Sequence, residues 1–544
     1  MFRLIYPACV ESTAPALRDA QDALARGDYA RAFEALDGLD HPAAQELLAN
    51  AHGELGNFAE ALSSREAAVH GYRAAGDDIA GARAATWLGS DRALLRGELV
   101  LARVWFERAE QLLEGAEACE EHGLLAFCRG RVELLLADDV ATARADGARA
   151  REIAQAIASE EIETLGLALE GLALVRGGEA QAGFELLDRA TAVAITGPPR
   201  STGSTGLVYC ALIDACERVH DVERASRWCE TLESLVQDNP SDVLFGYCRV
   251  HYSWLLIASG RLAEAERELE SALAAFARGA PALHFFGAFR LAALRLLQGR
   301  DDEAEAICAE LEWHPAALVQ RARLALARDR ADEAAALLAQ YRRGHPEASE
   351  LGDAAGIELA LRVALARAGD ADAAREVEKL ERLAESVDTP MLRGTAAFAR
   401  GLYADANGDA TRAEERFEDA LRLFLACRAP LEAARVRIEL GRVLERRGAR
   451  ERARRELEAA RAALEAAGAA GLLRDLGPER GGVLSAREIE VLSLAAAGLG
   501  DAAIAARLVL SEHTVHRHMA NIRRKLGQRT RAAAVAQAAR DGLI

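Results

Sequence analysis

Basic and polar side chains gather between residues 511 and 526, close to the end of this 544-residue chain. Ser511 is a good helix N-cap, because its hydroxyl can accept hydrogen bonds from the free amides of a first turn. Apolar residues then recur at i, i+4, i+7 and i+11, namely Val515, Met519, Ile522 and Leu526. This spacing predicts a helix over about 512–526 with one buried stripe. Its other side carries donors and cations, which suit the base edges and phosphates of a DNA major groove.

Eight residues of this helix, on the exposed side and its flanks, are candidate DNA contacts: Thr514, His516, Arg517, His518, Ala520, Asn521, Arg524 and Lys525. Taken alone, the same pattern would also fit an amphipathic surface helix with a solvated charged face. The three histidines at 513, 516 and 518 could suggest a metal site. Their side chains do not converge on one ion, however, and no nearby cysteine completes a ligand set, so we expect no metal.

Two helical patterns before this helix favour a helix-turn-helix arrangement. Ser485 and Glu488 form an S-x-x-E capping box at the start of the first, and Gly498 stands where a C′ glycine would end it. Asp501 can cap a second short helix, which a turn joins to the basic helix. A fourth helix begins near Thr530 and is too weakly polar to stand alone in water. We therefore expect the fourth helix to make a dimer contact.

From about Leu484 to Ala536 the sequence resembles the LuxR-type C-terminal helix-turn-helix of bacterial transcription regulators. The matching residues are Leu484-Ser485, Arg487-Glu488, Glu490-Val491-Leu492, Ala497, Gly498, Ile504-Ala505, Leu508, Ser511, Thr514-Val515, His518, Asn521-Ile522, Lys525-Leu526 and Arg529. The resemblance implies that the third helix enters the major groove of double-stranded DNA. The base-contacting positions fall on His516, Arg517 and Ala520. The positions near phosphates fall on Thr514, His518, Asn521 and Lys525. The fourth helix of the family forms the seam of a homodimer.

Three residues depart from the family pattern. Gly500 replaces a polar residue and Ala503 replaces a glutamate, so the second helix is expected to be less firmly capped. His516 stands where lysine or arginine is common, and an imidazole is a cation only at low pH.

Region four of a sigma factor has the same helix order. The short break at 497–498 and the residues of the run 518–526 favour the LuxR type.

The basic segment is attached to a larger part of the chain that is acidic. The chain has a formal net charge of −18, whereas residues 481–544 hold nine basic and five acidic residues. Such an asymmetry fits a basic DNA reader on a body that would avoid DNA by itself. No apolar run is long enough to cross a bilayer, and the opening MFRLIYPACV does not read as a signal peptide. We therefore expect a cytoplasmic bacterial protein with no membrane contact.

The cysteines point to the same compartment. There are nine of them, without any C-x-x-C pair: Cys9, Cys119, Cys128, Cys210, Cys216, Cys229, Cys248, Cys308 and Cys427. An odd number without metal spacing is typical of small buried hydrophobes in a reducing environment.

The first 470 or so residues repeat. A glycine followed five residues later by an alanine recurs at Gly27/Ala32, Gly56/Ala61, Gly97/Ala102, Gly177/Ala182, Gly260/Ala265, Gly299/Ala304, Gly369/Ala374, Gly408/Ala413 and Gly448/Ala453. Three further places keep the alanine and change the glycine: Asp138/Ala143, His220/Ala225 and Asp329/Ala334. The glycine can take the left-handed conformation that ends one helix, and the small alanine lets the next helix pack closely. Each window therefore predicts one helical hairpin.

The predicted fold is all-α: a tetratricopeptide-like solenoid of about twelve hairpins over 1–467, a linker over 468–483, and a small four-helix LuxR-type domain over 484–544. Spacings longer than the usual 34 residues make the repeats TPR-like rather than consensus. The concave surface of a solenoid binds a protein or a small ligand, so we expect an effector of one of these kinds there.

Two functions remain open at this stage. The first is a DNA-binding transcription regulator controlled by its solenoid. The second is a protein-interaction scaffold without sequence-specific DNA binding. An enzyme is not expected, because paired carboxylates, a nucleophile elbow, an HExxH pair and a P-loop are all missing from the sequence, and no cofactor is implied.

Overall fold

The computed structural model describes residues 15–196, 202–228, 242–344, 354–476, 484, 486–508, 510–540 and 543–544. These residues form α-helices and one short 3-10 helix, with no strand among them. The chain divides into two compact units, Met1–Leu472 and Leu473–Ile544, and each is treated by itself. None of the described helices combines the length and apolar character needed to cross a bilayer.

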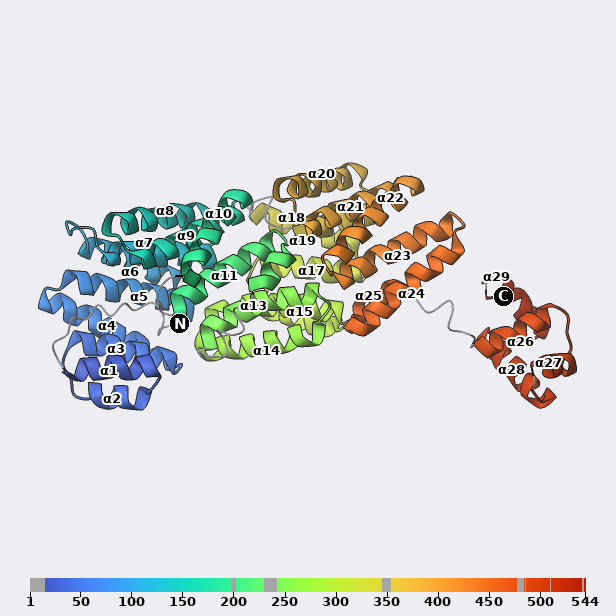
Figure 1. Cartoon of the computed structure of the whole chain (residues 1–544), viewed down its shortest axis with the longest axis horizontal. Helices are drawn as coiled ribbons and strands as arrows, with labels where there is room; N and C mark the ends of the chain where they lie inside the picture. The colour runs from blue at the N-terminus through green and yellow to red at the C-terminus, as the bar shows by residue number, and fades with distance from the viewer. Residues whose placement is uncertain are drawn as a thin grey trace. The chain divides into compact units, whose positions relative to one another are not determined.

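The first unit is a solenoid of helical hairpins (Figure 1). Its helices are α1 (Pro15–Arg26), α2 (Tyr29–Leu36), α3 (Pro42–Glu54), α4 (Phe58–Ala75), α5 (Asp78–Arg96), α6 (Leu99–Leu112), α7 (Glu120–Leu136), α8 (Val140–Ile157), α9 (Glu160–Arg176), α10 (Ala180–Thr196), α11 (Thr202–Arg218), α13 (Asp242–Ala258), α14 (Leu262–Gly279), η2 (Pro281–Leu283), α15 (His284–Leu297), α16 (Asp301–Glu310), α17 (Ala316–Ala327), α18 (Ala331–Gly344), α19 (Ala354–Ala366), α20 (Asp370–Val387), α21 (Pro390–Ala406), α22 (Ala410–Ala426), α23 (Pro430–Arg446) and α24 (Arg450–Ala467). Helix α25 (Ala470–Leu476) begins at the end of this unit. Residues 222–228 are also helical. Odd-numbered helices open the hairpins, and those of successive hairpins pack against each other.

At most hairpins the repeated glycine has the predicted left-handed conformation and the repeated alanine is buried as predicted. Seven of the glycines have a positive φ: Gly27, Gly56, Gly97, Gly260, Gly299, Gly408 and Gly448. Where the glycine is replaced, Asp138, His220 and Asp329 take the same left-handed conformation, with φ between 52° and 57°. The alanine five residues later is fully or almost fully buried in all ten hairpins. A small residue at that position therefore lies at the contact between the two helices of a hairpin.

Two hairpins are shifted by one residue from the predicted register. Gly178, not Gly177, has the positive φ of 91°, and the buried small residue is Gly183 rather than Ala182. Gly183 lies so close to α9 that an added Cβ would meet the Gly171 carbonyl oxygen at 2.6 Å, which explains why the position lacks a side chain. In the second case the left-handed residue is Ala368, one position earlier than predicted.

The solenoid winds far enough for distant hairpins to touch. The Thr389 hydroxyl donates to the Val219 carbonyl at 3.0 Å, across 170 residues of sequence. Helix α10 also contacts α20, and α13 contacts α23. At Gly260 an added Cβ would lie 2.8 Å from Pro430. The repeats are therefore held by contacts between turns of the superhelix as well as by contacts between neighbours.

Helix α25 lies inside the segment 468–483 that the sequence predicts as a linker, and it covers residues 470–476. Gly471 packs against the end of α15, where an added Cβ would clash with the Leu296 carbonyl oxygen. The remainder of the segment, 477–483, lies outside the described residues.

Two cysteines correct the expectation that all nine are free thiols. Cys210 on α11 and Cys248 on α13 form a disulfide, with Cα atoms 5.6 Å apart. They are 38 residues apart in sequence, which is one repeat, so successive odd helices place them side by side. Five other described cysteines are buried or half-buried: Cys119, Cys128, Cys216, Cys308 and Cys427. Cys9 and Cys229 lie outside the described residues.

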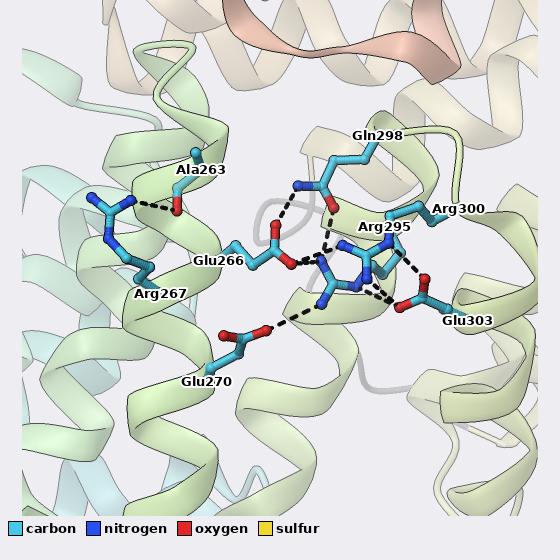
Figure 2. A network of polar contacts seen from close by, with 8 residues as sticks. All are labelled: Ala263, Glu266, Arg267, Glu270, Arg295, Gln298, Arg300 and Glu303. Atoms are coloured by element: carbon cyan, nitrogen blue, oxygen red, sulfur yellow. Dashed lines mark hydrogen bonds and ion pairs between the residues drawn. The ribbon is translucent and has the colours of Figure 1, made fainter.

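A buried arginine joins α14, α15 and the start of α16. Arg295 is only 4% exposed and makes ion pairs with Glu266 and with Glu303, the latter at 3.2 Å (Figure 2). Glu266 also accepts hydrogen bonds from Gln298 at 2.7 Å and from Arg300 at 2.8 Å. Burial raises the pKa of the Glu266 carboxyl, but these hydrogen bonds and the charge of Arg295 outweigh it and hold the pKa at about 2.

Replacing this carboxylate should change the acid sensitivity of the solenoid. The pKa of Glu266 is about 2 in the folded chain, below its ordinary value of 4.5, so its ionised form stabilises the fold above pH 4.5. This contribution is lost as pH falls from about 4.5 to about 2. We expect Glu266→Gln to lower the free energy of unfolding by about 1–2 kcal/mol at pH 7, and the difference from wild type to shrink below pH 4.5. Urea unfolding across this pH range measures it. Glu312→Gln, at an exposed site, is the control and should show no such trend.

Candidate nucleic-acid interface

Four helices of the second unit enclose one small core. They are α26 (Ala486–Ala496), α27 (Asp501–Leu508), α28 (Glu512–Lys525) and α29 (Arg531–Arg540). The buried residues of this core are Leu484, Val491, Leu492, Ile504, Ala505, Val515, Met519, Ile522, Ala534 and Ala538. The predicted stripe of α28 is confirmed, since three of its residues are buried and Leu526 packs partly against them. Burying this stripe fixes the opposite side of α28 toward solvent.

The ends of these helices follow the predicted capping, with one correction. The Ser511 hydroxyl accepts from the Thr514 amide at 3.1 Å, and Gly498 ends α26 with φ of 85°. Asp501 was expected to cap α27, but it is the first residue of that helix and forms an ion pair with Arg531 at 2.5 Å. The pair ties the start of α29 to the start of α27. Ser485, the first residue of the predicted capping box, lies outside the described residues.

The candidate contact residues share the solvent side of α28 and its flanks. His516, Arg517, Arg524 and Lys525 are exposed, and Thr514, His518, Ala520 and Asn521 are half-buried. The structure therefore brings all eight onto one helix, as the spacing predicts. No group of three or more histidine, cysteine or acidic side chains in the described part of the chain is placed to hold a metal ion.

The arginines of this surface are short of acidic partners. Arg517 makes no hydrogen bond or ion pair with the residues that the structure describes. The only partner of the Arg524 side chain among them is the amide oxygen of Asn521, at 3.2 Å. In the solenoid, by contrast, exposed arginines commonly meet carboxylates, as Arg452 meets Glu414 at 2.7 Å. The guanidinium groups of α28 thus remain available to an external anion.

Lys525 has a partner that sequence reasoning missed. Its amino group donates to the Glu488 carboxylate of α26 at 2.6 Å, and the Glu488 side chain is only 5% exposed. The two residues are 37 positions apart, so no local spacing links them. The only sequence signal is that Lys525 is one of two lysines in the chain, beside Lys379. An ammonium has three donors, so the pair leaves Lys525 able to donate to a phosphate as well.

The comparison with known proteins decides what this unit is. Residues 482–538 match the family described as bacterial regulatory proteins, luxR family. The second unit is a LuxR-type helix-turn-helix domain. Two curated relatives carry the name "Probable transcriptional regulatory protein NarL", from two strains of Mycobacterium tuberculosis. Each is 46% identical over 77 residues, which is 14% of this chain and 36% of the relative. The chain therefore spans about a third of these relatives, and the similarity concerns the LuxR-type domain.

Solved structures cover more of the chain at much lower similarity. The Cut9–Hcn1 assembly of the APC/C is 12% identical with a TM-score of 0.41, covering 85% of this chain and 89% of that chain. A monomeric IFIT1 mutant is 16% identical with a TM-score of 0.39, covering 75% of this chain and 90% of that chain. These values are too low to add to the description of the solenoid given by its own contacts.

Proposed function

We propose that this chain is a DNA-binding transcription regulator that reads the major groove with α28. The observation that carries the proposal is the exposed side of that helix, where Arg517 and Arg524 face solvent without a carboxylate partner among the described residues. A helix fits the major groove, and arginine is the commonest side chain to pair with guanine edges there. The LuxR-type match over 482–538 supports the same assignment.

The eight candidate residues divide by their position. His516, Arg517 and Ala520 are proposed to meet base edges, and Arg524 extends this surface by one turn. The residues proposed to meet phosphates are Thr514, His518, Asn521 and Lys525. Two of these already have local partners, since Ser511 bonds Thr514 and Glu488 bonds Lys525. Such contacts fix the side chains in place before DNA arrives, which lowers the entropy lost on binding.

The solenoid and α29 are proposed to control this binding. The solenoid offers a surface for a protein or a small-molecule effector. Helix α29 buries Ala534 and Ala538 in the core and leaves its other small residues toward solvent, which suits a second copy of the domain. The working unit on DNA is therefore a homodimer, and two half-sites of a symmetric operator would be read together.

Salt should weaken the binding of the full chain to duplex DNA. Each phosphate contact releases counterions, so we expect log Kd to rise linearly with log salt concentration, with a slope of roughly 0.9 per neutralised phosphate. Fluorescence anisotropy with DNA fragments selected from a random pool measures the slope. Binding that is absent, or that does not change with salt, would favour the scaffold interpretation over the regulator.

A further inference from the structure

Three of the twelve histidines of the chain lie within six residues of α28, at positions 513, 516 and 518. His513 and His516 are exposed, whereas His518 is half-buried. Histidine is the side chain whose unperturbed charge changes between pH 5 and 8. The charge that α28 presents to solvent therefore depends on pH through these residues.

His513 shares the exposed side of α28 with the two arginines that are proposed to meet DNA. Side chains three and four positions apart are neighbours on the surface of a helix. His513 is three positions before His516 and four before Arg517, and Arg524 follows Arg517 by two turns. His513 is not among the eight candidate contacts predicted from the sequence, yet it lies beside them. Helix α28 thus presents two imidazoles next to two guanidinium groups.

Neither exposed histidine has a partner among the described residues. His513 and His516 make no hydrogen bond and no ion pair with any of them. The one acid of α28 is Glu512, which is exposed one turn before His516 and forms no ion pair with it. The other charged residues of this helix are the cations Arg517, Arg523, Arg524 and Lys525.

The three helices that pack against α28 lie on its apolar side, away from His513 and His516. Each of their three acids already pairs with a cation: Glu488 with Lys525 at 2.6 Å, Glu490 with Arg487 at 2.6 Å and Asp501 with Arg531 at 2.5 Å. Their remaining charged residues are Arg507 and Arg540, which are exposed. Helices α26 to α29 therefore offer the two imidazoles no carboxylate other than Glu512.

We propose that His513 and His516 are proton-dependent contacts to DNA, so that binding takes up protons and strengthens as pH falls. An imidazolium donates from both ring nitrogens, and the acceptors available on DNA are phosphate oxygens and guanine edges. Phosphates also favour the charged form of each imidazole, because an opposite charge nearby stabilises it. The added affinity is present below about pH 6.5 and is lost as pH rises toward 8. The inference rests on the proposed function, because it adds a response to pH to the same DNA-binding surface.

Fluorescence anisotropy of the full chain with one selected duplex, at constant ionic strength between pH 6 and pH 8, tests the proposal. We expect the affinity of wild type to rise at least about tenfold from pH 8 to pH 6, since each proton taken up contributes up to about tenfold per pH unit. His513→Gln with His516→Gln should give a profile that is flat within about twofold, because glutamine donates without a titrating charge. Both sites are exposed, so this double variant should fold.

Calorimetry in buffers with different heats of ionisation provides a second measurement. Wild type should take up about one proton per chain on binding DNA at pH 7, and the double variant none. His516→Lys places a permanent cation on α28, so it should bind more tightly than wild type at pH 8 and gain less from pH 8 to pH 6. His70→Gln, at an exposed site of α4, is the control and should keep the wild-type profile.

The outcomes separate this inference from the regulator assignment. Wild type that binds the duplex equally well at pH 6 and pH 8 overturns the inference and leaves the regulator assignment in place. A double variant that keeps the wild-type pH profile does the same. A chain that binds no duplex at any of these pH values overturns both.

Discussion

The full-length chain with Arg517→Ala and Arg524→Ala should bind its selected DNA at least about 100-fold more weakly than wild type. A base-contacting arginine contributes roughly 1–3 kcal/mol to the free energy of binding, and a second cation adds to this. Both residues are exposed on α28 and neither supports the core, so the variant should fold. Anisotropy on selected and scrambled duplexes measures the change. Discrimination between the two duplexes should fall together with the affinity.

The control removes the same charge from the solenoid. Arg454→Ala with Arg455→Ala alters two exposed arginines of α24 and should leave DNA affinity within about twofold of wild type, because neither lies on the LuxR-type domain. Equal loss in both double variants would mean that net charge alone governs binding. Unchanged affinity of the α28 variant would remove this helix from the interface.

Lys525→Met should destabilise the LuxR-type domain by about 2–3 kcal/mol, because it leaves the carboxylate of Glu488 buried without its cation. Methionine keeps much of the apolar stem, so the loss reports the charge rather than packing. Hydrogen exchange of the amides of α26 and α28 in the full chain measures the effect within this domain.

A second substitution separates charge from structure. Adding Glu488→Gln to Lys525→Met removes the buried negative charge, so the double variant should recover part of the stability lost by the single one. Arg540→Ala replaces an exposed residue at the end of α29 and should change the stability of the domain little. If the single and double variants are equally unstable, the ion pair is not what holds α26 to α28.

The features that sequence predicts best here are periodic or capped. The apolar stripe of α28, the Ser511 cap and the left-handed turns of the hairpins all depend on residues within a few positions of each other. The sequence also predicts the left-handed turn where another residue replaces the glycine. At Asp138, for example, the buried alanine that follows fixes the register of the hairpin. Interactions between residues close together in the sequence are therefore sufficient to predict these elements.

The features that escaped prediction join residues far apart in the chain. The pair of Lys525 with Glu488, the Cys210–Cys248 disulfide and the contact of Thr389 with Val219 depend on how hairpins and helices are stacked. A one-residue shift of the kind seen at Gly178 also follows from close approach of α9 and α10, which the local spacing does not reveal.

The contact between superhelical turns has a consequence for how the solenoid melts. Repeat proteins whose units touch only adjacent units behave as one-dimensional chains, and they can fray from either end. Here the bond from Thr389 to Val219 and the packing of α13 on α23 link units that are far apart in sequence. Opening one middle hairpin therefore also costs contacts with the turn beside it. The solenoid should consequently unfold in few, highly cooperative steps. A conformational change in one turn of the superhelix can also reach the next turn directly, without passing through every hairpin between them.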